Sequence, residues 1–228
     1  MSSTNNVNTN PKAGLDALLT PDNCALLIID HQPFQFAGVK SHDTQTIINN
    51  VAALTKTAKG FGIPTLFSTV RQERGGYLIK QLQEIYPDQK PIDRTWINAW
   101  QDERVVDWVK QTGRKKLVIA ALWTEACLSM CSIHAAGEGY EVYIVTDASG
   151  GVSLEAHEMA IQRMILAGCM PITWGVFIME LQRDWARTET GPVVGENLVD
   201  YWGVVGSVLT WEHQFLATPA MGFEGVSA

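Results

Sequence analysis

Short aliphatic runs alternate along the chain with longer segments in which apolar residues recur at helical spacing. The aliphatic runs have the length and branched composition of buried strands, and they lie at 24–30, 63–70, 117–121, 140–146 and 170–174. The helical patterns lie at 44–59, 102–112, 124–136, 154–167 and 175–183, of which the last is expected to be the final helix. Connections of this length require parallel strands with helices on both faces. The pattern therefore predicts an α/β fold, a Rossmann-like three-layer αβα sandwich with a mainly parallel central sheet.

Two segments add detail to this prediction. Residues 71–95 resemble a loop with a short helical pattern inside it. In the helix at 154–167 the apolar positions define an inner face, which we expect to comprise Ala160, Ile161, Met164, Ile165 and Leu166.

The chain divides into a domain with a tail at each end. Residues 21–187 contain all the predicted strands and form one domain, whereas residues 1–20 begin with a polar, low-complexity stretch. The extension at 188–228 is rich in large apolar residues, namely Trp202, Val204, Val205, Val208, Leu209, Trp211, Phe215, Leu216, Met221 and Phe223. A monomer would expose this apolar surface, so we expect both tails to pack on neighbouring subunits. The low charged fraction of 18% favours the same interpretation.

Composition and missing motifs exclude several classes of function. A net charge of −7 argues against a nucleic acid partner. Neither a GxGxxG segment nor a Walker sequence occurs, which argues against a dinucleotide dehydrogenase or a kinase. No run of 18 apolar residues and no secretory signal pattern is present, so we expect no membrane partner. The four cysteines lack disulfide or zinc spacing, which indicates a reducing, cytoplasmic location.

Chemistry is expected where the strands end, because ligands of open α/β sheets bind at the carboxyl ends of the strands. Asp30 ends the first strand and is followed by aromatic residues, which would desolvate it and raise its pKa toward that of a useful base. Cys127 lies in the first turn of the helix that Thr124 is expected to cap. The N–H groups of that turn would lower the thiol pKa and stabilise an oxyanion. The alternative is that Cys127 is a small buried hydrophobic residue, as most free cysteines are.

Three segments in order along the chain resemble the isochorismatase-like cysteine hydrolase superfamily. They are LLIIDHQ with Asp30, the loop from Arg94 into INAW, and WTEACLSM with Cys127. The later segments TDASGG and QRDW, with Met159 and Arg163 between them, are similar to its YcaC-like branch. The resemblance covers residues 20–187, in the same order.

The resemblance implies a role for each matching residue. Asp30 takes the place of the carboxylate and Cys127 that of the nucleophile in an Asp–Lys–Cys triad, while Arg94 stands at the lysine position, as in the YcaC-like branch. A non-proline cis peptide would map onto Leu122–Trp123. It would turn the Trp123 N–H toward the pocket, where this group and the Cys127 N–H would form the oxyanion hole. The branch also has large closed assemblies, often octamers, so a homo-oligomer larger than a dimer is expected.

Nicotinamidases of the superfamily hold a metal through an Asp and nearby histidines. Here only His42 and Asp43 follow the first strand, without matching spacing, so we predict no metal and no other cofactor.

The expected activity is cysteine-dependent hydrolysis of a small amide-type substrate through a thioester. The candidate substrate-binding residues are Gln32, Phe34, Phe36, Asn98, Trp100 and Thr124. The aromatic residues among them, with Trp96 and Trp123, favour a small flat or apolar acyl group, but could equally be core or interface residues. Two alternatives stay open. One is isochorismatase-type or other non-amide hydrolysis, and the other is a weakly active binding or oligomer-forming protein, because arginine cannot exchange protons as lysine can.

Overall fold

The computed structural model describes residues 13–217, and six strands form one parallel sheet within this range. The strand order is β3-β2-β1-β4-β5-β6. The strands are β1 (Cys24–Ile29), β2 (Thr65–Val70), β3 (Ile92–Arg94), β4 (Lys116–Ala121), β5 (Glu141–Val145) and β6 (Met170–Ile172). Every neighbouring pair is parallel, with β1 and β4 at the centre. The prediction of an α/β fold with a parallel central sheet is confirmed.

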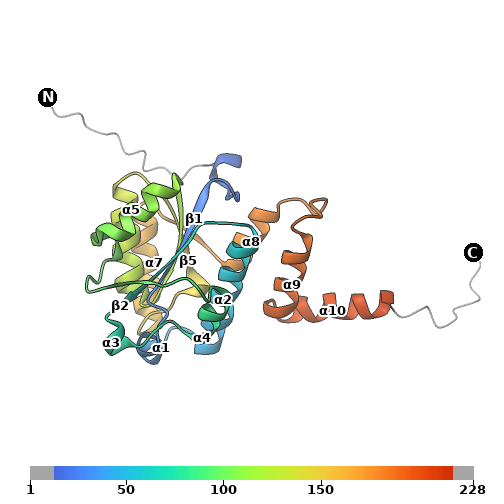
Figure 1. The fold of residues 1–228 in the computed structure, drawn as a ribbon, viewed down its shortest axis with the longest axis horizontal. Coiled ribbons are helices and arrows are strands. Elements are labelled where there is room, and N and C mark those ends of the chain that lie inside the picture. The colour runs from blue at the N-terminus through green and yellow to red at the C-terminus, as the bar shows by residue number, and fades with distance from the viewer. Residues whose placement is uncertain (1–12, 218–228) are drawn as a thin grey trace, which may run out of the picture.

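Helices cover both faces of the sheet (Figure 1). The longer ones are α2 (Thr44–Gly60), α5 (Glu103–Thr112), α6 (Ser129–Gly137), α7 (Leu154–Leu166), α8 (Trp174–Gln182), α9 (Gly191–Tyr201) and α10 (Val204–Ala217). The shorter ones are α1 (Pro33–Gly38), α3 (Gln72–Gly75) and α4 (Lys80–Ile85). Each face of the sheet has its own apolar core, one packed against α2, α8 and α9 and the other against α5, α6 and α7.

Side-chain alternation along the strands divides the two cores. In β1, Leu26 and Ile28 face the α2 side, whereas Leu27 and Ile29 face the α5 side. All four are at most 1% exposed, as are the corresponding residues of β4. Burial on both faces explains why the central strands consist of continuous aliphatic runs rather than alternating ones.

Two expectations about the chain path are wrong. The segment at 71–95 contains strand β3, which has only three residues and lies at the sheet edge. The helix at 174–182 is followed by two more, α9 and α10. Periodicity failed here because β3 is too short to show a period, and α9 contains Gly191, Pro192 and Gly195.

The expected inner face of α7 is only partly correct. Ala160 and Met164 are buried as predicted, but Ile165 is 46% and Leu166 is 89% exposed. His157 takes part in the buried face instead. The last turn of α7 therefore carries apolar residues that the described protomer leaves partly or largely exposed.

The described part of the first tail is fixed to the domain. Lys116 Nζ donates to the carbonyls of Asp16 and Leu18, at 2.7 Å for the latter, and the Leu19 N–H donates to Glu180 at 2.7 Å. Residues 1–12 and 218–228 lie outside the described residues, so their predicted packing on neighbouring subunits stays a prediction.

Leu26→Ala should destabilise the fold by about 2–5 kcal/mol, because it removes buried methyl groups from a central strand and leaves a cavity. Urea unfolding at fixed protein concentration measures this loss. Lys80→Ala is the control, because the Lys80 side chain is 82% exposed and its i,i+4 pair with Glu84 is worth about 0.5 kcal/mol or less. Equal unfolding midpoints for wild type and Leu26→Ala would contradict the core assignment.

Candidate active site

Asp30 lies at the carboxyl end of β1, in the middle of the sheet. Its backbone has φ 61°, in the left-handed region that residues other than glycine rarely adopt. The conformation is held on both sides, since the Asp30 N–H donates to the Ser68 carbonyl at 2.9 Å and its carbonyl accepts from the Gln32 N–H at 2.8 Å. Such backbone strain in a non-glycine residue is typical of functional sites.

Arg94 ends β3 and reaches across β2 to Asp30. Its Nη2 donates to Asp30 Oδ2 at 2.6 Å, and both side chains are fully buried. Its Nε donates to Ser68 Oγ at 3.1 Å, and its Nη1 donates to the Trp96 carbonyl. Three contacts therefore fix the guanidinium plane, and a positive charge stands permanently beside Asp30.

Cys127 follows the central strand β4 and is 6% exposed. It lies in a π-helical turn, Thr124–Leu128, that continues directly into α6. The N-cap residue of this turn is Trp123, whose side chain makes no capping hydrogen bond. The expectation that Thr124 caps this helix is therefore wrong. The turn belongs to one continuous helical segment, which explains why the sequence showed helical spacing from Cys127 onward.

The charges of the site couple the three residues. Burial raises the pKa of Asp30 from 3.8 to about 6, against the opposing effects of Arg94 and of a hydrogen bond with the Cys127 side chain. Burial also raises the pKa of Cys127, and the Asp30 carboxylate raises it further, while Arg94 and the Trp123 N–H lower it. The expected desolvation of Asp30 is thus present, but the expected lowered thiol pKa is not. At neutral pH the pair consists of a neutral thiol beside an ionised carboxylate.

The peptide between Leu122 and Trp123 is cis, as the resemblance implied. The Trp123 N–H forms a hydrogen bond with the Cys127 side chain, which lowers the pKa of the thiol, so this donor faces the sulfur. The Trp123 ring is fixed by its Nε1–H, which donates to the Gln35 carbonyl at 2.8 Å.

Most of the candidate substrate-binding residues have structural contacts. Gln32 bonds the N–H of Val70 at 2.9 Å and the carbonyl of Gly76 at 2.6 Å. Trp100 is 2% exposed in the core, and Asn98 accepts from the Trp100 N–H at 3.0 Å. Gln32 and Trp100 thus hold the framework around the site rather than line an open pocket.

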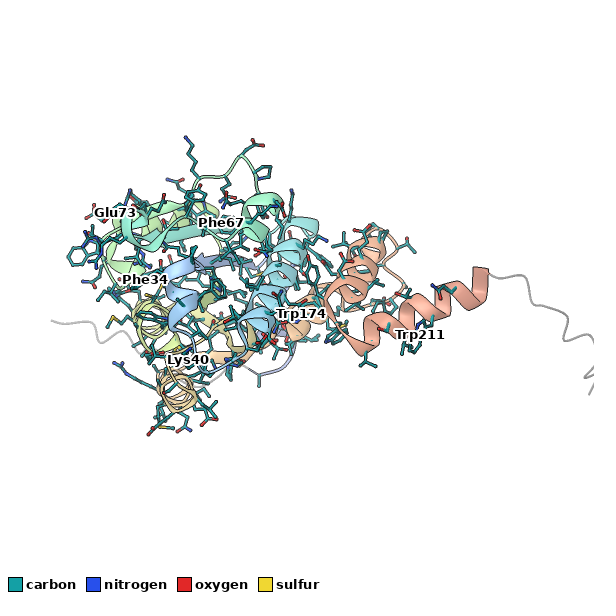
Figure 2. The ribbon with its side chains drawn as sticks, turned by 90° about the horizontal axis from the view of Figure 1, so that it is seen from below. Phe34, Lys40, Phe67, Glu73, Trp174 and Trp211 are labelled. Atoms are coloured by element: carbon teal, nitrogen blue, oxygen red, sulfur yellow. The ribbon has the colours of Figure 1, made fainter. Side chains whose placement is uncertain are left out.

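The aromatic candidates differ in how far their side chains are exposed. Phe36 is buried and meets His31 edge-on, with ring centroids 6.0 Å apart. Phe34 projects from α1 and is 56% exposed, with its ring 6.3 Å from that of Trp123 (Figure 2). Trp96, whose carbonyl binds Arg94, is 52% exposed. Phe34 and Trp96 are therefore the candidates that can still contact a ligand.

Sequence reasoning missed the residues whose hydrogen bonds hold the site residues and the end of β4 in place. Ser68 binds the Arg94 guanidinium, and Ser149 Oγ accepts from the Ala121 N–H at 3.1 Å at the end of β4. Thr124 Oγ1 lies 2.8 Å from His157 Nδ1, on α7. These partners are distant in sequence from the motifs, and serines and a histidine in apolar contexts carry no local signal of such a role.

The residues present do not fit a metal site of the nicotinamidase kind. His42 Nδ1 lies 2.8 Å from Ser41 Oγ, and its ring packs on His157 with centroids 4.7 Å apart. Asp43 Oδ1 accepts from the Thr46 N–H at the start of α2. Among the described residues no group of three or more His, Cys, Asp or Glu side chains could hold a metal ion. No described helix is long and apolar enough to cross a membrane.

The family model for the isochorismatase domain matches residues 24–175, which include all three residues of the charged site. The chain belongs to the isochorismatase family. It is 34% identical over 200 residues to the probable hydrolase YcaC of Escherichia coli strain K12, covering 86% of this chain and 96% of the relative. The family is thus one of hydrolases, and the chain is a probable hydrolase of its YcaC branch.

Two solved structures are similar over most of the chain. The crystal structure of the Escherichia coli YcaC gene product, described as an octameric hydrolase of unknown specificity, has TM-score 0.84 and 32% identity over 90% of this chain and 99% of that one. The structure of YcaC from Pseudomonas aeruginosa with hexane-2,5-diol and covalent acrylamide has TM-score 0.77 and 34% identity, over 84% of this chain and 96% of that one. A pyrazinamidase/nicotinamidase from Streptococcus mutans shares the fold at 19% identity, with TM-score 0.57, over 66% of this chain and 100% of that one.

Asp30→Asn should change how stability depends on pH. The folded-state pKa of Asp30, about 6, exceeds the ordinary 3.8, so the folded chain binds the extra proton in this range. The stability that Asp30 contributes to the fold through this raised pKa is therefore fully present below pH 4 and is lost as pH rises through 6. Asparagine does not titrate. Between pH 4 and pH 7 the unfolding free energy of the variant should therefore rise relative to that of wild type by on the order of 2–3 kcal/mol.

Urea unfolding of both proteins at several pH values measures this difference. Subtracting the unfolding free energies of the two proteins at each pH removes the contributions of His31 and His157. Burial lowers the pKa values of both histidines to about 4, and both titrate in wild type and in the variant. A difference that does not change with pH would show that the pKa of Asp30 is not raised.

Proposed function

We propose that this protein is a cysteine-dependent hydrolase of small amide-type substrates. The observation that carries the proposal is the buried constellation of Cys127, Asp30 and Arg94, with the Trp123 N–H directed at the thiol. A nucleophile, a base with a pKa of about 6 and an anion-stabilising donor are the groups that acyl transfer needs. The C–N specificity is supported by Cys127 itself, since a thiol nucleophile suits attack on a carboxamide carbon.

The first half of the reaction forms a thioester. As the Cys127 sulfur bonds to the carboxamide carbon, its proton passes to the Asp30 carboxylate, and the carbonyl oxygen becomes an oxyanion. The N–H groups of Trp123 and Cys127 stabilise that charge. When the intermediate collapses, the C–N bond breaks and Asp30 returns the proton to the leaving amine. Arg94 takes no proton, and its charge favours the ionised form of Asp30 before the thiol proton arrives and after Asp30 has given it up.

The second half restores the enzyme. Asp30 accepts a proton from a water molecule whose oxygen attacks the thioester carbon. The carbon–sulfur bond breaks, the proton passes to the Cys127 sulfur, and the carboxylic acid leaves. The raised pKa of Cys127 favours this last step, because the thiol form is the stable one at neutral pH.

Phe34 and Trp96 suit an acyl group that is small and flat or apolar. Both are more than half exposed, and each touches a catalytic element, Phe34 through the Trp123 ring and Trp96 through its carbonyl to Arg94. The structural contacts of Gln32 and Trp100 leave these two as the specificity residues in the proposal.

Assembly and location complete the proposal. The Escherichia coli relative is described as octameric, and this chain covers 99% of its length. We therefore assign this chain to a homo-oligomer larger than a dimer, with the octamer as the expected form. The four described cysteines are free and buried, which suits a reducing cytoplasm.

Cys127→Ala should lower hydrolysis of the best substrate in a panel of primary amides, nitriles and hydroxamates by at least about a thousandfold. Asp30→Asn should cost several orders of magnitude, because it removes the base. Mass spectrometry of wild type during turnover should show an acyl adduct on Cys127. Cys131→Ala and Cys169→Ala are the controls and should leave the rate within a few fold, since Cys127 is the cysteine whose side chain is hydrogen-bonded to Asp30. Hydrolysis that survives Cys127→Ala would contradict the covalent mechanism.

Arg94→Ala should slow alkylation of Cys127 by acrylamide near neutral pH, because the Arg94 charge lowers the pKa of this thiol. Arg94→Lys keeps a positive charge at the same place and should retain most of the rate. Peptide mass spectrometry measures modification of Cys127 over time, and near-UV circular dichroism checks that both variants are folded. Equal rates in wild type and Arg94→Ala would remove Arg94 from the proposed site.

A further inference from the structure

Helix α10 is held so that it points away from the sheet. Gly203 has φ 53° between α9 and α10, which permits the sharp change of direction. At Gly206 a Cβ atom would lie 2.5 Å from the Leu198 carbonyl oxygen and 2.6 Å from that of Val199, so only glycine allows the two helices to cross this closely. Figure 1 shows α10 extending outward from α9, beyond the helices that cover the sheet.

The face of α10 that points away from α9 is apolar and exposed. Val204 is 78%, Val208 is 49% and Trp211 is 55% exposed. Their spacing of four and three residues places them in one stripe, on the side opposite the buried Gly206. Figure 2 shows Trp211 on the projecting helix, far from Trp174 at the body of the domain. Soluble proteins rarely leave such a stripe uncovered.

A groove of matching character runs along α8. Its volume is about 660 Å³, and its lining includes the apolar residues Trp174, Val176, Met179 and Trp202 together with the charged residues Asp147, Glu180 and Arg183. The helix beside it follows β6, which is an edge strand of the described sheet. Trp202 meets Trp174 edge-on with ring centroids 5.9 Å apart, and α10 begins two residues after Trp202. The chain's own α10 therefore starts beside the groove and leads away from it.

We propose that the Val204–Val208–Trp211 face of α10 docks into the α8 groove of a second copy of this chain. Helix α10 starts beside the groove of its own chain and extends outward by about 20 Å. It can therefore enter the groove of a second copy, while α10 of that second copy enters the groove of the first. This reciprocal contact is isologous and closes around a two-fold axis. The inference rests on the proposed homo-oligomer and adds which surfaces form one of its interfaces.

Cross-linking of two different single variants tests the docking directly. Val176→Cys places a thiol in the groove, and Val208→Cys places one on α10. The four native cysteines are buried and do not compete. The two purified proteins are mixed, allowed to exchange subunits and oxidised under mild conditions. A disulfide between the two chains should form about tenfold or more above that of the control mixture of Lys80→Cys with Val208→Cys. A yield equal to the control would overturn the proposal.

Charge substitution provides a test that does not depend on subunit exchange. Val208→Asp or Val176→Arg alone should lower the mass measured by light scattering, because each places a charge among the apolar side chains of the interface. The double variant should recover the wild-type mass, since the two charges then pair across it. Unchanged mass in both single variants, or no recovery in a folded double variant, would overturn the docking while leaving the oligomer intact. A monomeric wild type would overturn both.

Discussion

The buried ion pair between Asp30 and Arg94 is the interaction on which the site depends. Two fully buried charges 2.6 Å apart lose their hydration, and this cost is offset only when geometry and further hydrogen bonds are good. Here Ser68 and the Trp96 carbonyl satisfy the rest of the guanidinium. The pair therefore joins the ends of β1, β2 and β3, and a carboxylate that burial alone would neutralise stays ionised near neutral pH.

The same electrostatics decide what Cys127 can do. A free cysteine at a helix start is expected to form a thiolate readily, but here burial and the neighbouring carboxylate favour the thiol. Asp30 and Cys127 therefore compete for one proton and function as a pair. Arginine at the third position has one role only, because it stays charged throughout and stabilises whichever partner is negative. In the proposed mechanism, Asp30 exchanges the proton with Cys127 and Arg94 contributes only its charge.

The sequence predicted the central strands and the order of the site segments because both are local properties. β1 and β4 are buried on both faces, so their composition alone identifies them, and Asp30 directly follows β1 while Cys127 lies in the turn after β4. β3 was missed because three edge residues carry no period. Thr124 was misjudged because its hydroxyl partner, His157, lies 33 residues away. Contacts of that kind depend on packing between elements, which a single sequence does not encode locally.

The exposed apolar residues of α7 and α10 have a physical meaning of their own. Helical periodicity correctly identified Ile165 and Leu166 as apolar positions, yet the described protomer leaves both exposed. The stripe on α10 is exposed in the same way. A hydrophobic pattern records burial in the assembled state and does not distinguish a core from an interface. The Escherichia coli relative that shares this fold is described as octameric, so in the proposed homo-oligomer these exposed apolar residues are the surfaces that neighbouring copies would cover.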